Sequence, residues 1–166
     1  MSRQRAQAGG SGIEVGAFYV LAVVLTGALT GVTIGVGSFT FVYAKGASYM
    51  YDNPMTCANC HVMQDHYDAW SRGSHHHVAT CNDCHAGHDP VFKYLVKGVN
   101  GFNHSLAMTT GNYHYPFQIT DFNRRVTEQA CRDCHQDIVQ QIDALPDHRG
   151  PGRMECIRCH ANVGHI

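Results

Sequence analysis

One pentapeptide pattern, Cys-x-x-Cys-His, occurs four times in this chain of 166 residues and contains every one of its eight cysteines. At this content of cysteine and histidine, random placement would produce only about 0.03 such pentapeptides per chain. The four copies are Cys57–His61, Cys81–His85, Cys131–His135 and Cys156–His160. The fold must therefore be organised around four equivalent units, each with two cysteines and a histidine.

This pattern is the attachment signature of c-type haem. Two thiols three residues apart can reach the two vinyl groups of one porphyrin, and the adjacent histidine can turn its ring toward the iron. Disulfides and zinc sites also use paired cysteines, but neither requires a histidine directly after each pair. The sequence therefore predicts four covalently bound c-type haems. The attachment residues are Cys57, Cys60, Cys81, Cys84, Cys131, Cys134, Cys156 and Cys159.

A long uncharged segment precedes the first motif. Residues 15–44 contain no Asp, Glu, Lys or Arg, and a helix needs roughly 20 apolar residues to span a bilayer. A cleaved signal peptide is the alternative, but its apolar region is usually about 7–15 residues long. The sequence therefore predicts a cytoplasmic lead over residues 1–14, a transmembrane helix over residues 15–44 and a periplasmic tetrahaem domain over residues 45–166.

Two observations orient this anchor. Arg3 and Arg5 lie on its short N-terminal side, which the positive-inside rule assigns to the cytoplasm. Covalent haem attachment takes place on the outer face of energy-transducing membranes, which puts the motifs on the opposite side. We therefore expect the protein in the bacterial inner membrane, with its N-terminus in the cytoplasm and its haem domain in the periplasm.

Three glycines in the predicted anchor, Gly27, Gly31 and Gly35, repeat every four residues. Residues at this spacing share one face of a helix, and small side chains there let a second helix approach closely. Glycine is also simply common in membrane helices. We expect this face to pack against a second copy of the chain or against a partner helix.

The chain after the anchor is small for its predicted cofactors. About 120 residues would enclose four haems, so the porphyrins must supply most of the core. We expect a mainly α-helical fold with much irregular structure, including a helix that follows Thr127-Glu128 and runs to Ile142. Residues 91–108 should form an amphipathic helix, either at the membrane surface or packed on porphyrin. The formal net charge of −1 gives no support to a nucleic-acid partner.

Four irons have eight axial positions, of which the motif histidines can fill four. Nine other histidines and six methionines compete for the rest. His75 opens a run of three histidines, so His76 or His77 could replace it as a ligand. Met63 lies two residues after His61 of the first motif and is a further candidate. The best distal candidates outside the motifs are His75, His114 and His165.

Several of these features together resemble one family. They are the single anchor, the four motifs, the Cys-His-x-Met sequence at the first motif, Ser74-His75 before the second motif and Asn100–Ser105 after it. This combination resembles the NapC/NrfH family of membrane-anchored tetrahaem quinol dehydrogenases, and within that family the small subunits of cytochrome c nitrite reductase. The resemblance covers nearly the whole chain.

The resemblance implies a set of iron ligands. Haem 1 would be attached at the first motif but would take Met63, in place of His61, as its proximal ligand. The three other haems would each have two histidines. These pairs are His85 with His165, His135 with His114, and His160 with His75.

The resemblance also implies a function. The protein would oxidise menaquinol beside haem 1 and pass the electrons to the catalytic multihaem subunit of a periplasmic nitrite reductase, in a complex where copies of the chain associate. Another periplasmic reductase could be the acceptor instead. An anchored electron relay without a quinol site is the alternative from a different class of protein.

The family's quinol site uses a lysine and an acidic residue seven positions further on, and these positions hold Lys97 and His104 in this chain. Seven residues make about two helical turns, so the two side chains share a face. His104 could accept a proton, since histidine titrates near neutral pH, or it could ligate haem 1. The departure from an acidic residue leaves three possible states of haem 1: five-coordinate, ligated by His104, or ligated by His61.

Overall fold

The computed structural model describes residues 10–145 and 154–165, and this part of the chain is helical, without a β-strand. The predicted fold class, mainly α-helical with much irregular structure, is therefore confirmed. The chain divides into two compact units, Met1–Gly46 and Ala47–Ile166. Most of the lead predicted over residues 1–14 lies outside the described residues.

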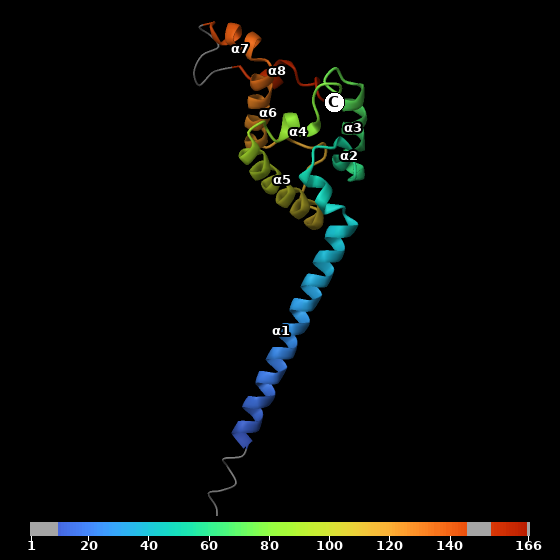
Figure 1. Ribbon diagram of the computed structural model, residues 1–166, viewed down its shortest axis with the longest axis vertical. Helices are drawn as coiled ribbons and strands as arrows, with labels where there is room; N and C mark the ends of the chain where they lie inside the picture. The colour runs from blue at the N-terminus through green and yellow to red at the C-terminus, as the bar shows by residue number, and fades with distance from the viewer. Residues whose placement is uncertain (1–9, 146–153, 166) are drawn as a thin grey trace, which may run out of the picture. The chain divides into compact units, whose positions relative to one another are not determined.

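The first unit contains one long helix, α1 (Gly10–Tyr43), drawn in blue in Figure 1. The 30 residues Glu14–Tyr43 contain an apolar stretch with a mean hydropathy of 2.0, and all of their side chains are exposed. A helix of that length is about 45 Å long, which exceeds the hydrocarbon thickness of a bilayer. Among the described residues, α1 is the one helix long and apolar enough to cross a membrane.

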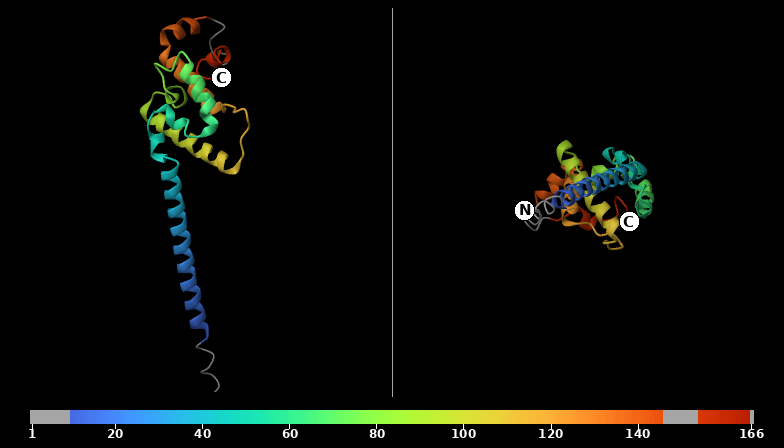
Figure 2. Two further views of the ribbon diagram at one scale, coloured as in Figure 1. Left: turned by 90° about the vertical axis from the view of Figure 1, so that its right-hand side faces the viewer. Right: turned by 90° about the horizontal axis from the view of Figure 1, so that it is seen from below.

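Short helices joined by irregular segments make up the second unit (Figures 1 and 2). The longest of them, α5, has 21 residues. The helices that follow α1 are η1 (Gly46–Met50), α2 (Pro54–Cys57), η2 (His61–Met63), α3 (Gln64–Arg72), α4 (Cys81–His85), α5 (Pro90–Thr110), α6 (Asp121–Cys134), α7 (Gln136–Asp143) and α8 (Cys156–Cys159).

The apolar core of the second unit is small. Its cluster of buried residues consists of Ala86, Val96 and Val126, with Phe122 packed against it. These residues come from the end of α4 and from α5 and α6, so the polypeptide core fixes the place where these three helices meet. Many other large apolar side chains of the unit remain exposed.

Helix α5 has the boundaries that its end residues favour. The Asp89 carboxylate accepts hydrogen bonds from the backbone N–H groups of Val91 and Phe92 at 3.1 and 2.7 Å, and Pro90 occupies the first helical position. Both features are typical of helix starts. The helix stops at Gly111, which adopts the left-handed conformation with a φ of 68°, as many helix ends do. The predicted helix over residues 91–108 is confirmed.

The predicted helix from Thr127-Glu128 to Ile142 is wrong at its start and in its continuity. α6 begins at Asp121, where the Thr120 hydroxyl accepts a hydrogen bond from the Asn123 N–H at 3.3 Å. It ends at Cys134 because His135, with φ −107° and ψ 34°, leaves the helical conformation, and α7 begins one residue later. The third motif therefore stands at a junction between two helices.

Candidate functional site

The two cysteines of each motif lie within one helical turn. Three of the pairs lie in α4, in the last turn of α6 and in α8. In the first motif, Cys57 ends α2, and the Cys60 N–H donates to the Cys57 carbonyl at 3.4 Å. Residues three apart on a helix point to the same side, so both thiols of a motif can face one macrocycle. All eight cysteines lie in the described part of the chain, and none of them is in a disulfide.

The four motifs follow one another in space in the order of the sequence. α2 packs against α4, α4 against α6, and α6 against α8. A hydrogen bond from Cys81 and the nearby charge of Lys97 lower the pKa of Cys57 to about 7, against the effect of burial. Burial, with the charge of Cys134 contributing, raises the pKa of Cys84, so the second motif also adjoins the third.

The third and fourth motifs are tied in the same way. Burial, followed by the effects of Glu128 and Cys131, raises the pKa of Cys156 to about 11. The Glu128 carboxylate also accepts a hydrogen bond from the Cys156 N–H at 2.7 Å. The fourth attachment pair thus lies against the last turns of α6, which carry the third.

Two pairs of histidine rings face each other at distances that suit an iron between them. The rings of His85 and His165 are 5.8 Å apart between centroids and nearly parallel, at 14°. Those of His75 and His135 are 6.1 Å apart at 76°. Metal–imidazole bonds of about 2 Å on both sides of one metal place the ring centres roughly 6 Å apart. Both pairs therefore fit the two axial ligands of a haem iron.

The second of these pairs differs from the one that the resemblance implies. The structure places His75 opposite His135, whereas the resemblance assigns His75 to His160 and His135 to His114. His114 and His160 are both exposed, and neither takes part in a ring pair among the described residues. Met63 ends the short helix η2 directly after the first motif and is half-buried.

Among the three consecutive histidines, His75 is the one that faces a motif histidine. The Ser74 hydroxyl lies 3.3 Å from His75 Nδ1, which leaves Nε2 for a metal. His76 directs Nδ1 to the Gly73 carbonyl at 3.3 Å, and its ring lies against that of His77 with 3.5 Å between centroids. The geometry therefore favours His75 over its two neighbours as an axial ligand.

His66 lies beside the pair formed by His85 and His165, and these three residues with His104 are called the histidine cluster. Nothing in the sequence distinguishes His66 from a surface histidine. Its ring contacts His165 at 4.8 Å and Phe117 at 6.1 Å between centroids. Its Nδ1 is enclosed and has no hydrogen-bond partner among the described residues. Contacts between residues about a hundred positions apart bring it there, and no local motif signals them.

The electrostatics of the cluster keep its central ring neutral. Burial, followed by the charges of His165, His104 and His66, lowers the pKa of His85 to about 4. Burial on its inner side also lowers the pKa of His104, while its side chain retains solvent exposure. The neutral imidazole is the form that binds a metal or accepts a proton.

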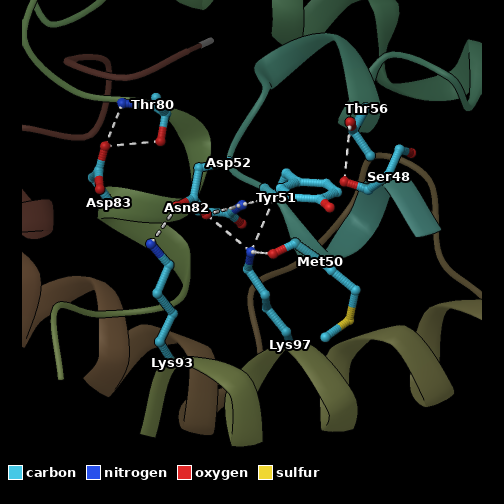
Figure 3. A network of polar contacts seen from close by, with 10 residues as sticks. All are labelled: Ser48, Met50, Tyr51, Asp52, Thr56, Thr80, Asn82, Asp83, Lys93 and Lys97. Atoms are coloured by element: carbon cyan, nitrogen blue, oxygen red, sulfur yellow. Dashed lines mark hydrogen bonds and ion pairs between the residues drawn. The ribbon is translucent and has the colours of Figure 1, made fainter. Parts of the chain in front are cut away.

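The two predicted quinol-site residues reach neighbouring motifs. The charge of Lys97 contributes to the lowered pKa of Cys57 in the first motif, and the charge of His104 contributes to the lowered pKa of His85 in the second. The Lys97 Nζ donates to the Asp52 carboxylate at 2.9 Å, to the Tyr51 carbonyl at 3.0 Å and to the Met50 carbonyl at 3.2 Å (Figure 3). Sequence reasoning missed Asp52, because an isolated aspartate 45 positions from Lys97 has no motif around it.

A zinc site would need a different arrangement. Structural zinc takes four ligands, and no group of three His, Cys, Asp or Glu side chains converges on one point within residues 10–145 and 154–165. Haem iron needs only two protein ligands on opposite sides of the macrocycle. The facing histidine pairs and the paired thiols fit haem.

An apolar spanning helix followed by a helical unit with repeated haem-attachment pairs defines a membrane-anchored c-type cytochrome. Residues 17–166 match the family model of the NapC/NirT cytochrome c family, N-terminal region. The chain belongs to this family, and the resemblance found in the sequence is confirmed. Its family and its apolar helix place the protein in the bacterial inner membrane.

The relatives of the chain are similar over most of their length. Cytochrome c-type protein NrfH of Wolinella succinogenes is 32% identical over 142 residues, covering 80% of both chains. Cytochrome c nitrite reductase subunit NrfH of Nitratidesulfovibrio vulgaris is 28% identical over 138 residues, covering 83% of this chain and 82% of the relative.

A solved structure has the same fold. It is the crystal structure of the cytochrome c nitrite reductase NrfHA complex bound to the inhibitor HQNO, and one of its chains matches with a TM-score of 0.59 and 27% identity. The match covers 84% of this chain and 90% of that one. The likeness therefore includes the second unit and is not limited to the anchor helix.

Proposed function

We propose that this protein is a membrane-anchored tetrahaem cytochrome that oxidises menaquinol and passes the electrons to the catalytic subunit of a periplasmic cytochrome c nitrite reductase. The observation that carries this proposal is the succession of four attachment pairs, which begins 14 residues after the end of α1 and continues motif by motif. One of the named relatives is a subunit of that reductase, and the related complex binds an inhibitor.

The residues present fit four haems. Each macrocycle would be held by one pair of thiols, and each bound haem would accept and pass on one electron at a time. We assign His85 and His165 to the second iron, and His75 and His135 to the third. Met63 would ligate the first iron and His160 the fourth. Among the described residues, the predicted distal ligand His114 has no motif histidine opposite it.

Lys97 and His104 would handle the quinol. Oxidation of a quinol releases two electrons and two protons, so the site must hold the quinol oxygen and accept protons. The Lys97 ammonium acts as a hydrogen-bond donor, which can exchange its longest contact, to the Met50 carbonyl, for a quinol oxygen. His104 has a lowered pKa and is neutral at pH 7, so its imidazole can take up a proton.

The topology follows from the attachment chemistry. Thioether formation outside the cytoplasm would place residues 45–166 in the periplasm and residues 1–14 in the cytoplasm, with residues 15–44 in the membrane. Arg3 and Arg5 agree with this orientation. Electrons would then enter at the first motif, which is nearest to α1 in the sequence, and leave toward a periplasmic partner.

One observation favours a second candidate function. All three Lys97 donors have acceptors within the protein, which suits an anchored electron relay that receives electrons from another cytochrome and binds no quinol. A redox measurement on the purified protein separates the two functions.

The deciding experiment reduces the detergent-solubilised holoprotein with 2,3-dimethyl-1,4-naphthoquinol, a menaquinol analogue, and in parallel with dithionite. We expect rapid reduction of the haems by both. Lys97→Ala should be reduced about ten- to a hundredfold more slowly by the quinol, since hydrogen bonds from charged groups are worth about 1.5–3 kcal/mol, and normally by dithionite. Lys45→Ala, at an exposed lysine outside the network, is the matched control.

Reduction of the wild type by dithionite alone would identify a relay without a quinol site. Equal quinol rates for Lys97→Ala and wild type would place the quinol elsewhere. Copurification with a larger multihaem subunit, and nitrite-dependent reoxidation of the quinol-reduced pair, would test the assigned electron acceptor.

A further inference from the structure

A network of polar contacts centred on Asp52 connects the segment before α2 with α4 and α5 (Figure 3). Asp52 Oδ1 accepts from Lys97 Nζ at 2.9 Å and from Asn82 Nδ2 at 2.9 Å. Its Oδ2 accepts from Lys93 Nζ at 2.6 Å. One carboxylate thus accepts hydrogen bonds from three side chains on two helices. Within the described residues, no other acidic side chain accepts from these three donors.

The Lys97 ammonium is held in one place. Its three acceptors come from three consecutive residues, 50–52, and its side chain is only 11% exposed. Two of the acceptors are neutral backbone carbonyls of Met50 and Tyr51, and the third is the charged carboxylate. All three bonds are assisted by the ammonium charge, but only Asp52 adds an opposite charge in an ion pair, so Asp52 is the main determinant of where the ammonium sits.

Asp52 also offsets a repulsion within α5. Lys93 and Lys97 are four residues apart on that helix, and like charges at this spacing destabilise one another. The carboxylate lies between them and contacts both. Without its charge, the two ammonium groups would repel each other and Lys97 would be free to turn toward solvent.

The network stands beside the first and second attachment pairs. The Lys97 charge lowers the pKa of Cys57, and Asn82 lies inside the second motif. The hydrogen bond from Lys93, followed by those from Lys97 and Asn82, lowers the pKa of Asp52 to about 2. Asp52 therefore stays ionised at neutral pH and is not a proton acceptor. Its side chain is 42% exposed.

We propose that Asp52 is a positioning residue for quinol oxidation, whose carboxylate holds the Lys97 ammonium beside the first haem-attachment pair, ready to donate to a quinol oxygen. This inference rests on the proposed quinol dehydrogenase function, because it assigns a role to Lys97 in that reaction. It adds a residue that touches neither the quinol nor a haem and acts through Lys97.

The test compares quinol-driven reduction rates of the holoprotein, with 2,3-dimethyl-1,4-naphthoquinol as the reductant. Asp52→Asn keeps the shape and one acceptor oxygen but removes the charge, and we expect about a tenfold lower rate. Its dithionite reduction and its haem content should match the wild type. Asp52→Glu restores the charge and should recover part of the rate. Asp121→Asn, at an exposed aspartate in the first turn of α6, controls for loss of a carboxylate elsewhere.

A double variant separates a positioning role from an independent one. If Asp52 acts through Lys97, the variant with both Asp52→Asn and Lys97→Ala is no slower than Lys97→Ala alone. A further tenfold loss in the double variant would overturn the proposal. So would loss of haem from Asp52→Asn with haem retained in Lys97→Ala, because Asp52 would then act on folding.

The outcome is distinguishable from failure of the proposed function. If the wild type is not reduced by quinol at all, the function itself fails. If the wild type is reduced and Asp52→Asn is reduced equally fast, only the role of Asp52 is overturned.

Discussion

His75 and His135 are sixty positions apart in the sequence, and their ring centroids lie 6.1 Å apart, a distance that suits two ligands of one iron. His75 comes from the loop after α3, and His135 from the junction between α6 and α7. The Ser74 hydroxyl near His75 Nδ1 orients the ring, as hydrogen bonds to the second nitrogen do for many metal-bound histidines. The pair therefore has the properties of two axial ligands of one haem.

We expect His75→Ala to convert one haem of the holoprotein from the low-spin to the high-spin state, because its iron loses one of two strong-field nitrogen ligands. Electron paramagnetic resonance of the oxidised protein measures this change. His76→Ala is the control, since the His76 ring packs on His77 and faces no motif histidine. A conversion caused by His114→Ala as well as by His75→Ala would instead support the pairing that the family resemblance implies, in which both histidines are iron ligands.

At the scale of single residues, the sequence predicts ligand types better than ligand partners. The motif spacing identifies the cysteines and their histidines without any structure, because attachment chemistry fixes that spacing. The partners of His75 and Lys97 could not be predicted, because these contacts join segments 60 and 45 positions apart. Their geometry depends on how α4, α5 and α6 pack.

Among the elements, α6, α7 and the start of α8 are joined through one buried arginine. Arg132 is 8% exposed and donates to Glu128 at 3.0 Å, to Asp143 at 2.9 Å and to the Met154 carbonyl at 3.2 Å. Glu128 in turn accepts the Cys156 N–H. This network holds the fourth attachment pair against the helix that carries the third.

Arg132→Ala should therefore destabilise the second unit by about 3–5 kcal/mol, the usual cost of breaking a buried charge network by removing one partner. We expect loss of the fourth haem and faster proteolysis between α7 and α8, measured by haem content and by the fragments of limited digestion. Arg124→Ala on the same helix removes an exposed ion pair with Glu155 and should cost less than about 1 kcal/mol. Equal sensitivity of the two variants would contradict a central role for Arg132.

Helix boundaries were predictable where strong end signals stand alone. Asp89-Pro90 and Gly111 delimit α5, and the predicted span differs from the observed one by only one or two residues at each end. The start of α6 was misplaced because Thr127-Glu128 and Thr120-Asp121 offer the same kind of capping signal. Packing of Phe122 against the core selects the earlier start. The break at His135 arises from the backbone of the motif itself.

At the scale of the whole molecule, α1 has one face that is lined by glycines and lacks side chains there. Gly27, Gly31 and Gly35 are four residues apart, and a side-chain carbon added at any of them meets no atom within 4 Å. Such a face lets a second helix approach closely in lipid, where packing and weak polar contacts drive association. It is the surface of the anchor best suited to a second copy.

We expect Gly31→Leu to weaken self-association of the detergent-solubilised protein, because a large side chain would hold two helices apart. Chemical crosslinking and analytical ultracentrifugation measure the change. Gly37→Leu is the matched control, since position 37 points away from this face and is equally open. An unchanged oligomeric state in Gly31→Leu would exclude this face as a contact.

The facing rings of His85 and His165 have a consequence for how the protein matures. With His165 assigned to the second iron, the haem attached at the second motif would take its opposite ligand from beyond the fourth motif, so its ligation would wait until the fourth motif and His165 have been made. A chain cut short after the fourth motif would carry all its thioether bonds and still be defective near its beginning. Ligation of the second haem would thus depend on a residue eighty positions further along the chain.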